Sequence, residues 1–61
     1  MSEEKKDKVY EIYTSSGNRV TVKGTDLLTD FNAGDITIYN SMGEAVASFE
    51  LMNIEGWRVA P

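Results

Sequence analysis

Turn-forming residues interrupt this chain at short intervals, and their spacing constrains its fold more than any other feature. Gly17, Gly24, Gly34 and Gly43 separate segments that are rich in Val, Ile, Thr and Tyr. Such β-branched and aromatic residues favour strands, and short strands with turn signals between them are typical of antiparallel all-β folds. The sequence therefore predicts about five short antiparallel strands in a small barrel or curved meander, of the size of SH3-like and Sm-like barrels.

Alternation of side chains indicates which faces of these strands are buried. Val20 and Val22 share one face of the second strand, and Ile36 and Ile38 share one face of the third. A strand that alternates in this way has one face toward the core. The expected strands are residues 9–14, 19–23, 35–40, 45–51 and 54–59, and the first two should form a hairpin across the turn at 15–18.

Residues 25–31 form the one ambiguous segment. Thr25 or Asp26 could cap a helical turn, with Leu27, Leu28 and Phe31 directed inward. A helix of so few residues is not stable by itself. We therefore expect at most one helical turn or a connecting arm in this segment.

The chain has 61 residues, which is room for one domain. Residues 1–7 have mixed charge and no apolar periodicity, so we interpret them as a disordered tail and residues 8–61 as a single small β domain. Domains this short are marginally stable. Since the chain has no Cys and no His, disulfides and the usual zinc sites cannot support it. Self-association is the remaining support, and we expect a homo-oligomer, with a dimer favoured.

The charge balance bears on partners and location. The formal net charge is −4, with six basic and ten acidic residues, which argues against tight binding of a phosphate backbone. No apolar segment approaches the length of a membrane span, and none near the N-terminus has the pattern of a signal peptide. With no cysteine, the chain fits the cytoplasm. We expect a cytoplasmic protein that binds no membrane.

Catalysis and metal binding are not indicated. Without His and Cys the chain has no Ser-His pair, no thiolate nucleophile and no His-ligated metal, so we predict no catalytic residue, cofactor or metal site, and no enzyme. Asp26, Asp30 and Asp35 would need a cleft that shifts a pKa to act as acid or base. A calcium loop starting at Asp30 would place Gly34, Asp35 and Ser41 at positions 5, 6 and 12, which does not fit an EF-hand.

Aromatic side chains are the candidate interface. A sheet edge can pair with a copy of itself or accept another strand, and aromatic residues and Arg are enriched at interfaces. Trp57 could anchor such an interface or plug the open end of the sheet, and the other rings could be core or cross-strand pairs. The candidate interface residues are Tyr10, Tyr13, Tyr39, Trp57 and Arg58. The leading hypothesis is a non-enzymatic protein-interaction module that self-associates through its sheet edges.

Two alternatives involve nucleic acid. The aromatic residues could form a stacking platform for single strands, with Arg19, Lys23 and Arg58 beside them, as in small barrels that bind nucleic acid. The acidity could instead mimic DNA phosphates and inhibit a nucleic-acid-binding protein. That role needs carboxylates aligned on one surface, whereas the sequence spreads them over several elements: Glu11, Asp26, Asp30, Asp35, Glu44, Glu50 and Glu55.

The C-terminal half carries a resemblance. The segments at 36–40 and 44–51, followed by Asn53, Ile54 and Trp57, are similar to short uncharacterised proteins of Gram-positive bacteria, their phages and mobile elements. The shared pattern is a strand, a turn, an apolar strand, a Leu-x-Asn-Ile-like break and a terminal strand with an aromatic residue. The resemblance implies a small β fold and a bacterial or phage source, and it assigns no functional residue.

Overall fold

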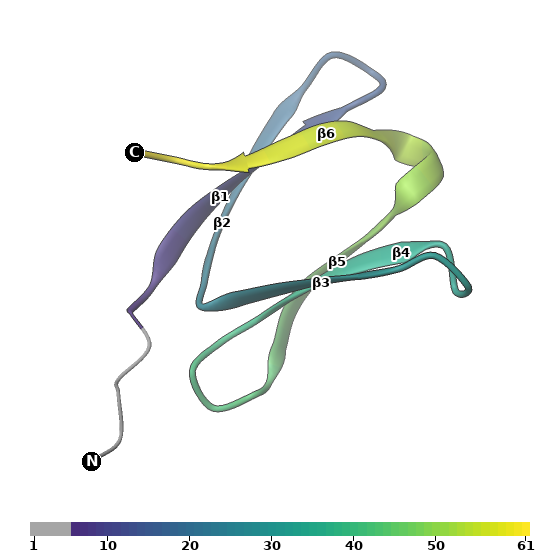
Figure 1. Ribbon diagram of the computed structural model, residues 1–61. Helices are drawn as coiled ribbons and strands as arrows, with labels where there is room; N and C mark the ends of the chain where they lie inside the picture. Colours follow the sequence, from purple (N-terminus) through teal and green to yellow (C-terminus); the bar gives the residue numbers. More distant parts are fainter. Residues whose placement is uncertain (1–5) are drawn as a thin grey trace.

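The computed structural model describes residues 6–61 and contains six β-strands and one short 3-10 turn (Figure 1). The predicted all-β class is confirmed, with six strands rather than about five. The predicted tail falls mostly outside the described residues, and Lys6 and Asp7 belong to no strand. The elements are β1 Lys8–Thr14, β2 Arg19–Gly24, β3 Asp26–Asp30, β4 Asp35–Tyr39, β5 Ala45–Glu50, the 3-10 turn η1 Leu51–Asn53 and β6 Ile54–Val59. Among residues 6–61 no helix is long and apolar enough to span a membrane.

The strands form two antiparallel three-stranded sheets that are not closed into a barrel. Sheet A has the order β2-β1-β6, and sheet B has the order β3-β4-β5. Thr25 alone connects β2 to β3, and η1 connects β5 to β6, so the chain crosses between the sheets at these two places (Figure 1). The expected hairpin at 15–18 is present, since β1 pairs with β2.

Residues 26–30 form strand β3, so the expected helical turn or arm is wrong. β3 pairs with β4 in a continuous register from Asp26 opposite Tyr39 to Asp30 opposite Asp35. The strand alternates, so Leu27 faces the core while Leu28 is 59% exposed, and Phe31 beyond the strand is 85% exposed. The ladder with β4 provides the backbone hydrogen bonds that a single helical turn would leave unmade.

A close approach at the end of β2 brings the two sheets together. A Cβ atom at Gly24 would lie 2.5 Å from Ile38 Cγ2 and 2.9 Å from the carbonyl oxygen of Tyr39. The next residue, Thr25, is 2% exposed, and its backbone N–H donates to the same carbonyl at 2.8 Å. Glycine is therefore required at this corner for packing against β4.

The core is small and lies between the two sheets. Four apolar side chains are buried: Tyr10, Ile12, Ile36 and Ile38. The inward direction predicted for Ile36 and Ile38 is confirmed. Five more pack against the core while partly exposed: Val22, Leu27, Ala47, Phe49 and Ile54. Residues of β1 and β4 are covered best because these are the central strands of the two sheets.

Candidate functional site at the β6 edge

Strand β6 carries the candidate site, because its inward-facing side chains remain half exposed. Among the described strands it pairs only with β1, where Trp57 lies opposite Ile12 and Val59 lies opposite Tyr10. Ile12 and Tyr10 are 0% and 3% exposed, whereas Trp57 and Val59 are 43% and 44% exposed. We call Trp57 and Val59, with the backbone between them, the β6 edge. A strand whose outer edge is unpaired, with exposed apolar side chains beside it, can bind another chain.

The backbone N–H and C=O groups of Trp57 and Val59 point away from β1, toward the open side of sheet A. The N–H of Ala60 donates to the carbonyl of Val9 at 2.7 Å, so the backbone groups of Ala60 point toward β1. Alternate residues of an antiparallel strand direct their N–H and C=O groups to opposite sides. The N–H groups of Trp57 and Val59 therefore point outward, where another strand can accept or donate hydrogen bonds.

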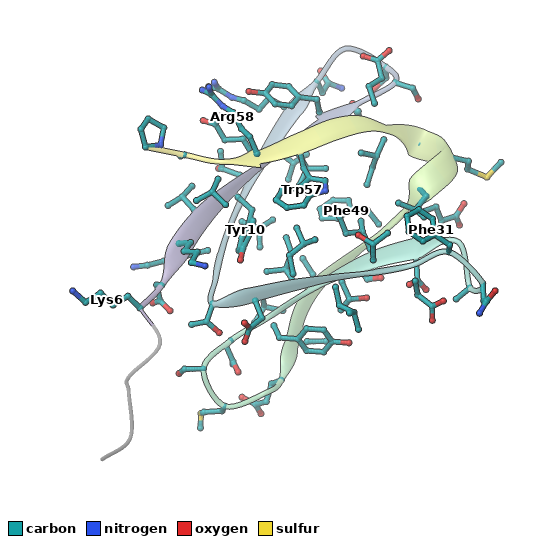
Figure 2. The ribbon with its side chains drawn as sticks, viewed as in Figure 1. Lys6, Tyr10, Phe31, Phe49, Trp57 and Arg58 are labelled. Carbon is teal, nitrogen blue, oxygen red and sulfur yellow. The ribbon has the colours of Figure 1, made fainter. Side chains whose placement is uncertain are left out.

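An aromatic contact fixes the position of Trp57. Its ring lies 6.0 Å from the ring of Tyr10, at an interplanar angle of 61° (Figure 2). This edge-to-face geometry is favourable for two aromatic rings. Burial of Tyr10, with a smaller effect from the charge of Asp26, raises the pKa of its phenol. Trp57 therefore packs against the buried Tyr10 while 43% of it remains exposed.

A bulge limits the regular part of this edge. Gly56 pairs with Tyr13 and Ile54 with Thr14, so Glu55 is the extra residue on β6. Bulges interrupt a ladder and are one way in which proteins protect sheet edges. The regular edge runs from Gly56 to Val59, which includes both outward N–H groups.

The outer face of sheet A holds an ion-pair cluster. Glu11 is 9% exposed, and its carboxylate accepts hydrogen bonds from Arg58 Nε and from the Tyr13 hydroxyl, the latter at 3.1 Å. Arg19 Nη1 lies 3.8 Å from the second carboxylate oxygen. The hydrogen bond from Arg58 is the main reason that the pKa of Glu11 lies below its ordinary value. The same bond raises the pKa of Arg58.

The carboxylate of Glu11 is fully paired with the side chains around it. No buried side-chain nitrogen or oxygen in residues 6–61 lacks a hydrogen-bond partner. A depression of about 430 Å³ beside the cluster is lined by Tyr13, Thr14, Gly17, Asn18, Arg19 and Glu55. Because Glu11 is already paired, this cluster holds β1, β2 and β6 together rather than presenting an unpaired acid or base.

Asp30, one of the three carboxylates considered for catalysis, caps a turn. Asp30 Oδ1 accepts hydrogen bonds from the N–H groups of Asn32 and Ala33, each at 3.0 Å. This side-chain cap forms the turn between β3 and β4. Within residues 6–61 no group of three or more acidic side chains is arranged to hold a metal ion.

The five candidate interface residues lie in three places. Tyr10 and Trp57 pack together on the inner face of sheet A, and Tyr13 and Arg58 meet through Glu11 on its outer face. Tyr39 lies on sheet B, opposite Asp26 and Ala45 in the register. The set therefore forms no single surface.

Sequence reasoning missed two members of these surfaces. Val59 was assigned to the last strand without a role, although it forms the β6 edge with Trp57. Glu11 was counted among dispersed acids, although it pairs with Arg58, 47 positions later. The alternation of β1 does place Glu11 and Tyr13 on one face, but only the register of β6 brings Arg58 to them.

Of the aromatic rings considered for a stacking platform, Tyr13 shares a face with the cations, whereas Tyr10 and Trp57 lie on the opposite face of sheet A and Tyr39 lies on sheet B. Arg19, Lys23 and Arg58 belong to the outer face of sheet A, opposite Tyr13, Val9 and Glu11 in the register. Tyr10 and Trp57 belong to its inner face. Comparison with family models, with curated proteins and with solved structures found no match to this chain.

Proposed function

We propose that this chain is a non-enzymatic protein-interaction module that binds by strand addition at the β6 edge. The observation that carries the proposal is the outward N–H of Val59 beside a Trp57 that is 43% exposed. Added strands gain affinity from main-chain hydrogen bonds and specificity from side-chain pockets. The cysteine-free composition supports a cytoplasmic location as part of this proposal.

A second copy is the partner that fits this edge most simply. Two β6 strands related by a two-fold axis would pair antiparallel, and each would offer the same outward groups to the other. The pairing would join two copies of sheet A into one continuous sheet. It would also cover Trp57 and Val59, which remain partly exposed in the single chain.

Proline substitution tests the backbone part of this proposal. Val59→Pro removes an N–H that points away from β1, so it leaves the hydrogen bonds of sheet A intact. We expect Val59→Pro to abolish self-association while the fold survives. Val59→Thr is the matched control, because it keeps the N–H and the β-branched shape. Its association should stay near that of the parent chain.

Light scattering from about 10 µM to about 1 mM protein measures the association. The parent chain should exceed the monomer mass of 6.8 kDa as the concentration rises. A clean monomer throughout this range would refute self-association at the β6 edge. Equal association by the Val59→Pro variant and the parent would refute strand addition, as would an equal loss in Val59→Pro and Val59→Thr.

A further inference from the structure

Strand β6 offers outward hydrogen bonds over a short segment. The N–H groups of Trp57 and Val59 point away from β1. The bulge at Glu55 ends the regular edge on one side, and Pro61 has no N–H to donate on the other. The register of two β6 strands related by a two-fold axis is therefore set by two residues of each copy.

One register uses the outward groups of both copies within the regular edge. When the axis passes at Arg58, Trp57 of each copy lies opposite Val59 of the other, and the two residues exchange N–H and C=O bonds. An axis at Trp57 would bring Val59 opposite the bulge. An axis at Val59 would bring Trp57 opposite Pro61, which lies outside β6 and has no N–H to return. The axis at Arg58 is therefore preferred.

This register places the two Arg58 side chains beside each other. Arg58 is on the outer face of sheet A, so its side chain points away from that of Trp57 (Figure 2). At the axis it forms a non-hydrogen-bonded pair with Arg58 of the second copy, in which the Cα atoms are about 4.5 Å apart. Like charges directly opposite each other are destabilising. The pairing therefore needs a group that neutralises Arg58.

Glu11 provides the neutralising charge. It lies opposite Arg58 on β1, and its carboxylate accepts a hydrogen bond from Arg58 Nε. The side chain of Glu11 is only 11% exposed, so water screens this pair weakly. The charged and titratable groups that face Glu11 are Arg58 on β6, Arg19 on β2 and Tyr13 on β1. In the joined sheet, one row would run from Glu11 through both Arg58 residues to Glu11 of the second copy.

We infer that the Glu11 carboxylate controls the pairing of β6 with β6 of a second copy, by neutralising the Arg58 side chains that meet at the two-fold axis. This inference rests on the proposed function, because it concerns the same edge and the same partner. Glu11 acts through Arg58 and needs no contact with the second copy. Protonation of Glu11 should therefore weaken self-association.

Light scattering from about 10 µM to about 1 mM protein tests the role of charge. Glu11→Gln removes the charge but keeps an oxygen that can accept from Arg58, so its apparent dissociation constant should rise at least about fivefold. Glu11→Gln/Arg58→Gln removes the like charges as well, so its association should return close to that of the parent. Damage to the fold by Glu11→Gln would not be repaired in this way. Glu44→Gln is the matched control, because it changes the net charge equally on the turn between β4 and β5, and it should associate like the parent.

Salt and acid give independent readouts. Salt screens exposed charges over about 10 Å at 0.1 M, so raising it from about 10 mM to about 500 mM should strengthen association of Glu11→Gln relative to the parent. The hydrogen bond from Arg58 lowers the pKa of Glu11, and a second Arg58 should lower it further. Association of the parent should therefore be full above the ordinary pKa of 4.5 and weaken as the pH falls through the lowered pKa. Glu11→Gln should lack this acid transition.

Disulfide cross-linking tests the register. The chain has no Cys, so a single introduced Cys reports one position. With the axis at Arg58, Arg58→Cys has its two Cα atoms about 4.5 Å apart, which a disulfide can span. Val59→Cys has them about 8 Å apart, which is too far. Oxidised glutathione should therefore cross-link Arg58→Cys faster than Val59→Cys.

Three results would overturn the inference. They are parent-like association of Glu11→Gln, a double variant that stays as weak as Glu11→Gln, and faster cross-linking of Val59→Cys than of Arg58→Cys. Circular dichroism shows which variants are folded. If Glu11→Gln does not fold, the cross-linking comparison and the acid transition of the parent decide.

The proposed function fails separately from this inference. Association that Val59→Pro abolishes and Glu11→Gln leaves unchanged would refute the role of Glu11 and leave strand addition at the β6 edge intact. A parent chain that stays monomeric throughout the concentration range would refute both.

Discussion

Replacing Gly24 with Ala should destabilise the protein through a steric conflict at the corner between the sheets. The added Cβ would lie 2.5 Å from Ile38 Cγ2 and 2.9 Å from the Tyr39 carbonyl oxygen. Neither neighbour is free to move. Ile38 is fully buried, and the Tyr39 oxygen accepts a hydrogen bond from the Thr25 N–H at 2.8 Å.

The expected cost follows from two opposing effects. Overpacking a well-filled site costs about 1–3 kcal/mol. Ala in place of Gly also restricts the unfolded chain, which offsets about 0.4–1 kcal/mol. The net loss should be about 1–2 kcal/mol, against a total of about 3–9 kcal/mol for a domain of this length. The corresponding fall in Tm is about 4–16 °C.

Urea denaturation followed by the fluorescence of the single Trp measures this effect. Gly56→Ala is the matched control, because a Cβ at Gly56 would meet no atom within 4 Å. Its free energy of unfolding should stay within about 0.5 kcal/mol of the parent value. The argument is refuted if Gly24→Ala keeps the parent stability, or if Gly56→Ala is destabilised equally.

Further predictions concern the core, the ion-pair cluster and the β6 backbone. Ile38→Ala should cost about 2–5 kcal/mol in urea denaturation, because the side chain is fully buried, whereas the exposed Leu28→Ala should change stability little. The pKa of Glu11 is lowered by Arg58, so its contribution to stability is present above its ordinary pKa of 4.5 and lost as the pH falls through the lower folded pKa. The stability difference between parent and Glu11→Gln should therefore shrink in acid, and a difference that grows would contradict this assignment. Ala60→Pro should lower the urea midpoint, unlike Val59→Pro, because it removes the hydrogen bond to Val9.

Local patterns were enough to predict most of the strands. The alternation of Val20 and Val22 and of Ile36 and Ile38 identified the inner faces, and the turn residues marked where the strands end. Residues 26–30 were harder, because Leu27 and Leu28 are adjacent and fit a helical turn as well as a strand. Pairing with β4 decides between them, and that pairing is a tertiary interaction.

The candidate site depended on contacts that the sequence does not encode locally. Trp57 was identified from its residue type, but its exposure follows from the order of strands in sheet A. Asp30 lies opposite Asp35, which lies opposite Glu50, so these three carboxylates form one row across sheet B, and this row depends on two registers at once. The alignment of three carboxylates on one face, which the sequence did not indicate, is therefore present on sheet B.

The place of β6 in sheet A has a consequence for folding. Sheet B and the β1–β2 hairpin pair strands that are neighbours in the chain, whereas β6 must return to β1 over a separation of 47 positions, as between Glu11 and Arg58. Pairings of high sequence separation form late, since the loop must close before the contacts stabilise it. Until β6 of the same chain has paired with β1, the β6 strand of another copy can pair with β1 through the same side chains. Refolding at high concentration should therefore produce dimers that have exchanged β6, with η1 as the hinge.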